Sequence, residues 1–182
     1  MGRILSFLLA ALAALLAGCA SLPPPHDRNA SAALTDTADT RLGRAVAPYV
    51  AAHPGLSGTH KFPEPHDAFA ARMLLATAAE KSLDAQYFIW NGDEVGYLLF
   101  EALWKAAGRG VRVRLLLDDA TTRGLDPTLA ALDAHPNIEV RLYNPFAYRG
   151  SRAIGYLTEF GRLNRRMHNK SFTADNQLSV VG

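Results

Sequence analysis

The sequence predicts an α/β domain in which a mostly parallel sheet is flanked by helices. From Asp67 onward, segments with helical apolar spacing alternate with short segments rich in β-branched and aromatic residues. Capping and turn residues such as Asp93 and Gly110 mark the changes. The chain of 182 residues is 49% apolar and 20% charged, which is typical of a globular domain with a real core.

The first half of the domain alternates regularly. A helix capped by Asp67 is expected to about Lys81, and "LDAQYFIW" (83–90) is a predicted strand. Asp93 can cap a second helix, 94–107, which ends at Gly108 or Gly110. The segment "VRVRLLLD" (111–118) is the next strand. This order predicts βαβ units with right-handed crossovers.

The second half is less regular. The expected elements are a short helix (126–134), a strand (138–144), a loop-like stretch with a possible short helix near 157–163, and two strands (166–174 and 177–182). Asp175 and Asn176 lie between the last two strands. Both residue types tolerate a left-handed backbone, so a tight hairpin is expected there.

The segment "RRMHNKSFTAD" contains the candidate catalytic residues. Residues two apart in a strand share a face, so His168 and Lys170 are expected to point the same way. This arrangement suits a neutral histidine that attacks an anionic centre such as a phosphodiester, while the lysine stabilises the phosphate oxygens. Asp175 either folds back towards this site or shapes the hairpin. Each residue alone has an ordinary structural explanation, and only the triple spacing is specific.

"HNKSFTAD" resembles the HxKxxxxD motif of the phospholipase D superfamily, and Gly182 falls where that family has a glycine. The segments "LDAQYFIWNGDEVGYLLFEALWKAAGRGVRVRLLLDD" and "EFGRLNRRMHNKSFTADNQ" are similar to the N-terminal half of bacterial C-type cardiolipin synthases. The resemblance covers roughly residues 45–182. It implies the N-terminal lobe of a phospholipase D-like fold.

The resemblance also implies a mechanism. His168 would be the nucleophile that forms a phosphohistidine, Lys170 and Gly182 would bind the phosphate, and Asp175 would be a supporting acid. No metal or other cofactor is implied. The substrate would be a phospholipid, with water or a lipid headgroup as acceptor.

The sequence contains one HxKxxxxD motif, whereas the superfamily brings two together at one site. We therefore expect a truncated half-domain, completed by a missing second half or by a second chain. Two alternatives stay open. One is an inactive truncated fragment, and the other is a single-motif nuclease completed by dimerisation. The net charge of +2 and the N-terminal segment disfavour nucleic acid as a partner.

The N-terminal segment has the pattern typical of a secretory signal peptide. Arg3 precedes an apolar run, and Leu16-Ala17-Gly18-Cys19 resembles the lipobox of bacterial lipoproteins. The expected organisation is a signal peptide (1–18), a flexible tether (19–44) and the half-domain (45–182). Cys19 is the expected lipidation site. The protein would then be anchored in the cell envelope facing the periplasm, in the outer membrane rather than the inner one because aspartate does not follow the cysteine.

Other conspicuous residues are interpreted as structural. Asp118-Asp119 ends a predicted parallel strand, where α/β sites often lie, but a loop and helix-cap role is preferred over a metal or catalytic one. Trp90, Trp104 and Tyr87 are expected in the core rather than at a substrate.

Overall fold

The computed structural model describes residues 30–182, together with residues 2, 4, 6 and 22. Cys19 and most of the predicted signal segment therefore lie outside the described residues. The chain forms two compact units, one of Ser31–Tyr143 with Met167–Gly182 and the other of Met1–Ala30 with Asn144–Arg166. In the described part, no helix is both long and apolar enough to cross a membrane.

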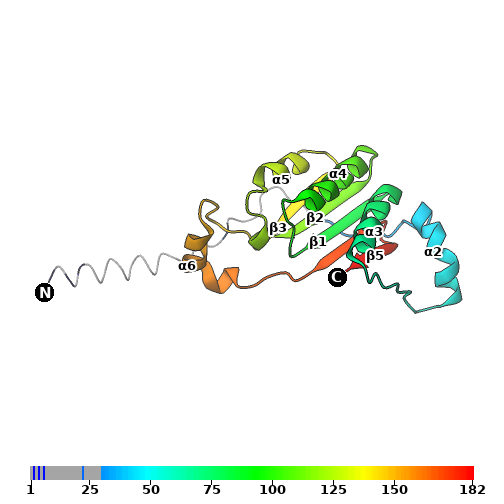
Figure 1. Cartoon of the computed structure of the whole chain (residues 1–182), viewed down its shortest axis with the longest axis horizontal. Coiled ribbons are helices and arrows are strands. Elements are labelled where there is room, and N and C mark those ends of the chain that lie inside the picture. The colour runs from blue at the N-terminus through cyan, green and yellow to red at the C-terminus, as the bar shows by residue number, and fades with distance from the viewer. Residues whose placement is uncertain (1, 3, 5, 7–21, 23–29) are drawn as a thin grey trace. The chain divides into compact units, whose positions relative to one another are not determined.

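The larger unit is built on one five-stranded sheet with the order β3-β2-β1-β4-β5 (Figure 1). The strands are β1 (Ser82–Tyr87), β2 (Arg112–Asp118), β3 (Ile138–Tyr143), β4 (Lys170–Ala174) and β5 (Leu178–Val181). β1, β2 and β3 are parallel neighbours, whereas β4 is antiparallel to both β1 and β5. Four strands therefore share one direction, and the expected mostly parallel α/β sheet is confirmed.

Helices cover one face of this sheet. They are α3 (Pro65–Ala78), α4 (Glu94–Gly108) and α5 (Asp126–Asp133), and Figure 1 shows them over the strands. Apolar side chains that alternate along the strands pack beneath these helices. The central ones are Leu83, Ala85, Val113, Leu115, Leu117, Val140 and Phe172. Burial of these side chains is the main stabilising contribution to the unit.

The opposite face of the sheet is polar and partly exposed. Asp84, Arg114, Arg141 and Thr173 alternate with the core residues and are only partly buried. Within the described residues, the helices that contact the sheet lie on the other face, so the flanking predicted from the sequence is present on one side.

The predicted start of helix α4 is confirmed, whereas that of α3 is not. Helix α4 begins at Glu94, and the side chain of Asp93 accepts a hydrogen bond from the amide of Gly96 at 2.9 Å, as a capping residue should. Helix α3 begins at Pro65 rather than after Asp67. Proline is favoured in the first helical turn because its φ angle is already helical and it lacks an amide hydrogen.

Strands β1 and β4 are shorter than predicted. Beyond their ends, backbone groups form hydrogen bonds with side chains instead of with a neighbouring strand. Beyond β1, the Thr121 hydroxyl donates to the carbonyl of Phe88 at 2.9 Å and accepts from the amide of Trp90 at 3.4 Å. Before β4, the amide of Met167 donates to the carboxylate of Asp118 at 2.9 Å. The chain at both places therefore leaves the ladder without losing hydrogen bonds.

Residues 31–44 are more ordered than the predicted tether. Thr37 and Thr40 are fully buried, and Thr40 caps helix α2 (Arg41–Ala52) by accepting from the amide of Gly43. Lys81 at the start of the sheet donates to Asp39 at 2.6 Å. Composition alone predicted a free segment here, but its small polar side chains serve as caps and anchors on the domain.

The other unit contains α6 (Arg152–Leu163), which is longer than the short helix predicted near 157–163. The side-chain amide of Asn144 donates to the carbonyls of Arg162 and Arg165 at 2.7 and 2.8 Å, which satisfies the carboxyl end of the helix. A Cβ atom at Gly155 would meet the ring of Phe146 at 2.7 Å, so only glycine fits at that contact.

Candidate active site

The structure brings His168 and Lys170 together. Lys170 is the first residue of β4, and its Nζ lies 3.3 Å from Nε2 and 3.4 Å from Nδ1 of His168. His168 lies just before the strand rather than in it, so the prediction that both residues belong to the strand is wrong for the histidine. The imidazole is exposed and the lysine is half-buried, which leaves the pair accessible to a ligand.

Neighbouring elements hold the segment that carries His168. The amide of Met167 donates to Asp118, and the amide of Phe88 donates to the carbonyl of Asn169 at 2.8 Å. The rings of Phe88 and His168 lie 5.1 Å apart between centroids. The nucleophile candidate therefore stands on a backbone fixed on both sides, next to a ring that restricts its movement.

Asp118 and Asp119 act as turn and cap residues, in agreement with the preferred interpretation. The Asp118 carboxylate accepts from the amide of Ala120 at 2.8 Å and from that of Met167, and Asp119 accepts from the Thr122 hydroxyl. Among the described residues, no group of three metal-ligating side chains occurs. The contact to Met167 was missed from the sequence because the two residues are 49 positions apart.

Asp175 lies at the far end of β4 from Lys170. Its carboxylate is fully buried and accepts three backbone hydrogen bonds, from the amides of Glu80 at 3.0 Å, Lys81 at 2.7 Å and Ser82 at 2.9 Å. A strand rises about 3.3 Å per residue, so roughly 16 Å of strand separates Asp175 from Lys170. The sequence left two roles open for Asp175, folding back towards the active site or shaping the hairpin. The geometry favours the second role, in which Asp175 joins the hairpin to the start of β1.

Gly182 lies beside Lys170. Its amide donates to the Lys170 carbonyl at 3.0 Å, so the hairpin of β4 and β5 brings the two residues to the same end of the sheet. Asp175 and Asn176 both have φ angles of 51°, as expected for a tight turn between these strands. The structure thus gathers His168, Lys170 and Gly182 and leaves Asp175 apart.

The gathered residues include a lysine that has no ion-pair partner among the described residues. Elsewhere in this unit, Arg114 pairs with Asp84 at 2.5 Å and Lys81 pairs with Asp39 at 2.6 Å. Lys170 forms no such ion pair within the described part of the chain. A cation that lacks an internal carboxylate partner favours the binding of an anion, and a phosphate group fits that description.

Two of the three aromatic residues expected in the core, Trp90 and Tyr87, are buried there. Trp90 is buried and stacks on Phe100 at 4.6 Å, and its ring meets that of Tyr87 edge-on at 5.2 Å. Burial raises the pKa of the Tyr87 phenol, so it stays protonated at neutral pH. Trp104 differs from expectation, because it is 46% exposed and lies against His135.

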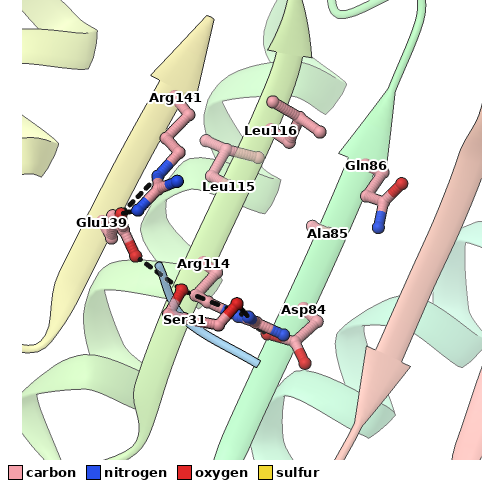
Figure 2. Close-up of a pocket in the computed structure, with 9 residues that line it drawn as sticks. All are labelled: Ser31, Asp84, Ala85, Gln86, Arg114, Leu115, Leu116, Glu139 and Arg141. Carbon is pink, nitrogen blue, oxygen red and sulfur yellow. Dashed lines mark hydrogen bonds and ion pairs between the residues drawn. The ribbon is translucent and has the colours of Figure 1, made fainter. Parts of the chain in front are cut away.

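A shallow hollow lies on the polar face of the sheet (Figure 2). Arg114 is bonded there to Asp84 and Ser31, and Arg141 is paired with Glu139. Side chains an odd number of residues apart in a strand point to opposite faces, and Asp84 and Tyr87 are three residues apart on β1. The hollow therefore opens on the face opposite Tyr87 and Lys170, its partner in the ladder. Its charges are satisfied internally, and it is separate from the candidate active site.

Comparisons with known proteins agree with the motif. The family "Cardiolipin synthase, PLD-like domain" matches residues 74–182. Cardiolipin synthase C of Escherichia coli (strain K12) is 58% identical over 142 residues, which cover 78% of this chain and 30% of that protein. An uncharacterized protein of Helicobacter pylori (strain ATCC 700392 / 26695) is 34% identical over 170 residues, covering 91% of this chain and 33% of that protein.

Among solved structures, NucT from Helicobacter pylori aligns with a TM-score of 0.46 and 19% identity, over 64% of this chain and 65% of that one. The chain spans about a third of the length of the curated relatives described above.

Proposed function

The chain belongs to the phospholipase D-like cardiolipin synthase family, and from this premise we propose that it takes part in phosphatidyl transfer or phospholipid hydrolysis. The single observation that supports this most directly is the pairing of His168 with Lys170 at 3.3 Å in an accessible place. The identity to cardiolipin synthase C favours a phospholipid over other phosphodiesters.

In the proposed first step, a ring nitrogen of His168 donates its lone pair to the phosphorus of a phospholipid. A P–N bond forms, and the P–O bond to the leaving headgroup alcohol breaks. Lys170 stabilises the negative charge on the phosphate oxygens. The leaving oxygen takes a proton from a general acid, which we assign to the histidine of a second HxKxxxxD motif elsewhere in the protein or in a second chain.

In the second step, a hydroxyl group attacks the phosphorus, and the P–N bond breaks to regenerate the neutral histidine. The proton of the attacking hydroxyl passes to the residue that acted as the acid. Water as acceptor gives phosphatidic acid, whereas the headgroup hydroxyl of another phospholipid gives a cardiolipin-type product. No step requires a metal or another cofactor.

The decisive experiment introduces His168→Ala into the native gene and measures lipid products by mass spectrometry. We expect the loss of all product that depends on this protein, because the proposed first step requires the ring nitrogen of His168 and alanine has no group that can attack phosphorus. His60→Ala is the control, since His60 is exposed and its ring lies against Phe62. Normal product levels in His168→Ala cells would refute the assignment.

Trapping the covalent intermediate tests the mechanism separately. A brief reaction with a ³²P-labelled phospholipid, quenched in base, should leave label on the wild-type protein and none on the His168→Ala variant. Acid treatment should release this label, because a phosphohistidine is acid-labile. A parallel reaction with labelled DNA examines the nuclease alternative: turnover of DNA with no turnover of lipid would overturn the proposed substrate class.

We also propose that a lipid on Cys19 holds the protein at the periplasmic side of the outer membrane. The lipobox-like tetrapeptide supports this, as does a phospholipid substrate. Mass spectrometry of the mature N-terminal peptide should find a diacylglyceryl group on the cysteine. Cys19→Ala should move the protein out of the membrane fraction, and an unmodified cysteine in the mature protein would contradict the proposal.

A further inference from the structure

Arg72 on helix α3 uses two of its three guanidinium nitrogens in hydrogen bonds within the described part of the chain. Its Nε donates to the hydroxyl of Tyr87 at 2.7 Å, and its Nη1 donates to the carbonyl of Ala68 at 2.6 Å. These two bonds fix the plane of the half-buried guanidinium. Within the described part of the chain, Nη2 has no hydrogen bond and Arg72 has no carboxylate partner.

The sheet register places this arginine beside the active-site residues. Tyr87, which binds Arg72, pairs directly with Lys170 across the antiparallel ladder, so the two side chains share a face. A Cβ atom built on Gly182 would lie 3.9 Å from Nη2 of Arg72, and the Gly182 amide is bonded to Lys170. Arg72 and Lys170 therefore flank the same glycine from two different elements.

Arg72 and Lys170 bring two positive charges to this end of the sheet, and neither has a carboxylate partner among the described residues. The contrast lies on the other face of the same sheet, where Asp84 neutralises Arg114. A guanidinium offers parallel N–H groups that match the oxygens of a phosphate, whereas a lysine ammonium acts as a compact point charge. The pair thus fits one phosphate group better than a carboxylate or a neutral ligand.

We propose that Arg72 is a second phosphate-binding residue of this site and that Tyr87 positions it. The proposal rests on the proposed function for the nature of the substrate. Arg72 binds a non-bridging oxygen from the side of α3, and Lys170 binds the group from β4. The ligand chemistry is that of a phosphate or phosphodiester, so free phosphate and a lipid headgroup are both bound.

Binding of inorganic phosphate tests the site without any turnover. The line width of the ³¹P resonance is followed during titration of the protein, for the wild type and for Arg72→Gln, Arg72→Lys and Tyr87→Phe. Loss of one charged hydrogen bond weakens binding by roughly 10- to 100-fold, and we expect this range for Arg72→Gln. Arg72→Lys should recover part of the affinity because the charge remains.

Tyr87→Phe should weaken binding by roughly threefold, since it removes only the bond that orients the guanidinium and keeps the charge. Arg41→Gln is the matched control. It makes the same change of charge at an arginine on α2 that pairs with Glu80, and it should leave phosphate affinity unchanged. Circular dichroism shows whether each variant is folded at the temperature of the titration.

Lipid turnover by the same variants separates this inference from the proposed function. If Arg72→Gln weakens phosphate binding but the wild type, assayed together with the second HxKxxxxD motif, turns over no phospholipid, the anion site stands and the proposed function fails. If the wild type turns over phospholipid and folded Arg72→Gln matches it within twofold in phosphate affinity and in kcat, Arg72 is not a ligand. A wild-type protein that binds no phosphate refutes the inference as well.

Discussion

Substituting Asp175 by alanine tests whether this residue of the motif builds the fold rather than the chemistry. The substitution removes the buried carboxylate that accepts from three amides, those of Glu80 and Lys81, which are partly buried, and that of Ser82, which is buried. Leaving one buried donor without a partner costs about 1–3 kcal/mol, so three fully buried donors would cost about 3–9 kcal/mol. Because two of the three are only partly buried, we expect the free energy of unfolding to fall by about 3–6 kcal/mol. That is a large share of the roughly 5–15 kcal/mol typical of a domain.

The assay is urea unfolding of the protein at 25 °C, followed by far-ultraviolet circular dichroism, together with a thermal scan. For a chain of this size, about 4 kcal/mol corresponds to a fall in Tm of roughly 8–16 °C. Asp93→Ala is the matched control. That carboxylate caps α4 through the single amide of Gly96, so about 1 kcal/mol should be lost. Asp175→Ala within about 1 kcal/mol of the wild type would refute the reasoning.

Two further predictions use the same protein. Asp118→Ala should reduce kcat for lipid turnover roughly 10- to 100-fold with little change in KM, because it frees the amide of Met167 and loosens the nucleophile's segment; an unchanged kcat would refute this positioning role. Gly96→Ala should destabilise the protein by at least about 3 kcal/mol in urea unfolding, because the new Cβ would lie 2.0 Å from the carbonyl oxygen of Asn91. Gly108→Ala in the same helix meets nothing within 4 Å and should be neutral or slightly stabilising, and equal effects of the two substitutions would contradict the steric argument.

The elements predicted well from the sequence are those set by local signals. Helix α4 combines an apolar face with a capping aspartate, and its bounds agree with the prediction to within one residue. Strand β2 agrees equally well, because its alternation of arginine with apolar residues matches a half-buried strand. The hairpin at Asp175 follows from the backbone preferences of two adjacent residues.

The features missed from the sequence depend on contacts between distant residues. The capping of residues 80–82 by Asp175 joins positions up to 95 apart, and no periodicity reports it. Arg72 stands in the middle of a helix, where arginine is ordinarily a solvated side chain. Only the register of β1 with β4 shows that it reaches the active-site end of the sheet. His168 and Lys170 could be predicted as a pair from the sequence because their spacing is itself local.

The place of β4 in the sheet also has a kinetic consequence. Contacts between β1 and β2, such as that of Asp84 with Arg114, join residues 30 apart, whereas Asp175 reaches back 95 residues to Glu80. Closing the longer loop costs only about 1 kcal/mol more in chain entropy, but pairings of large sequence separation form slowly. We therefore expect the β1–β2–β3 layer to assemble first and β4 to dock onto it afterwards. Reactivity at His168 would then appear only when the last strands are in register, so the onset of activity during refolding reports the completion of the domain.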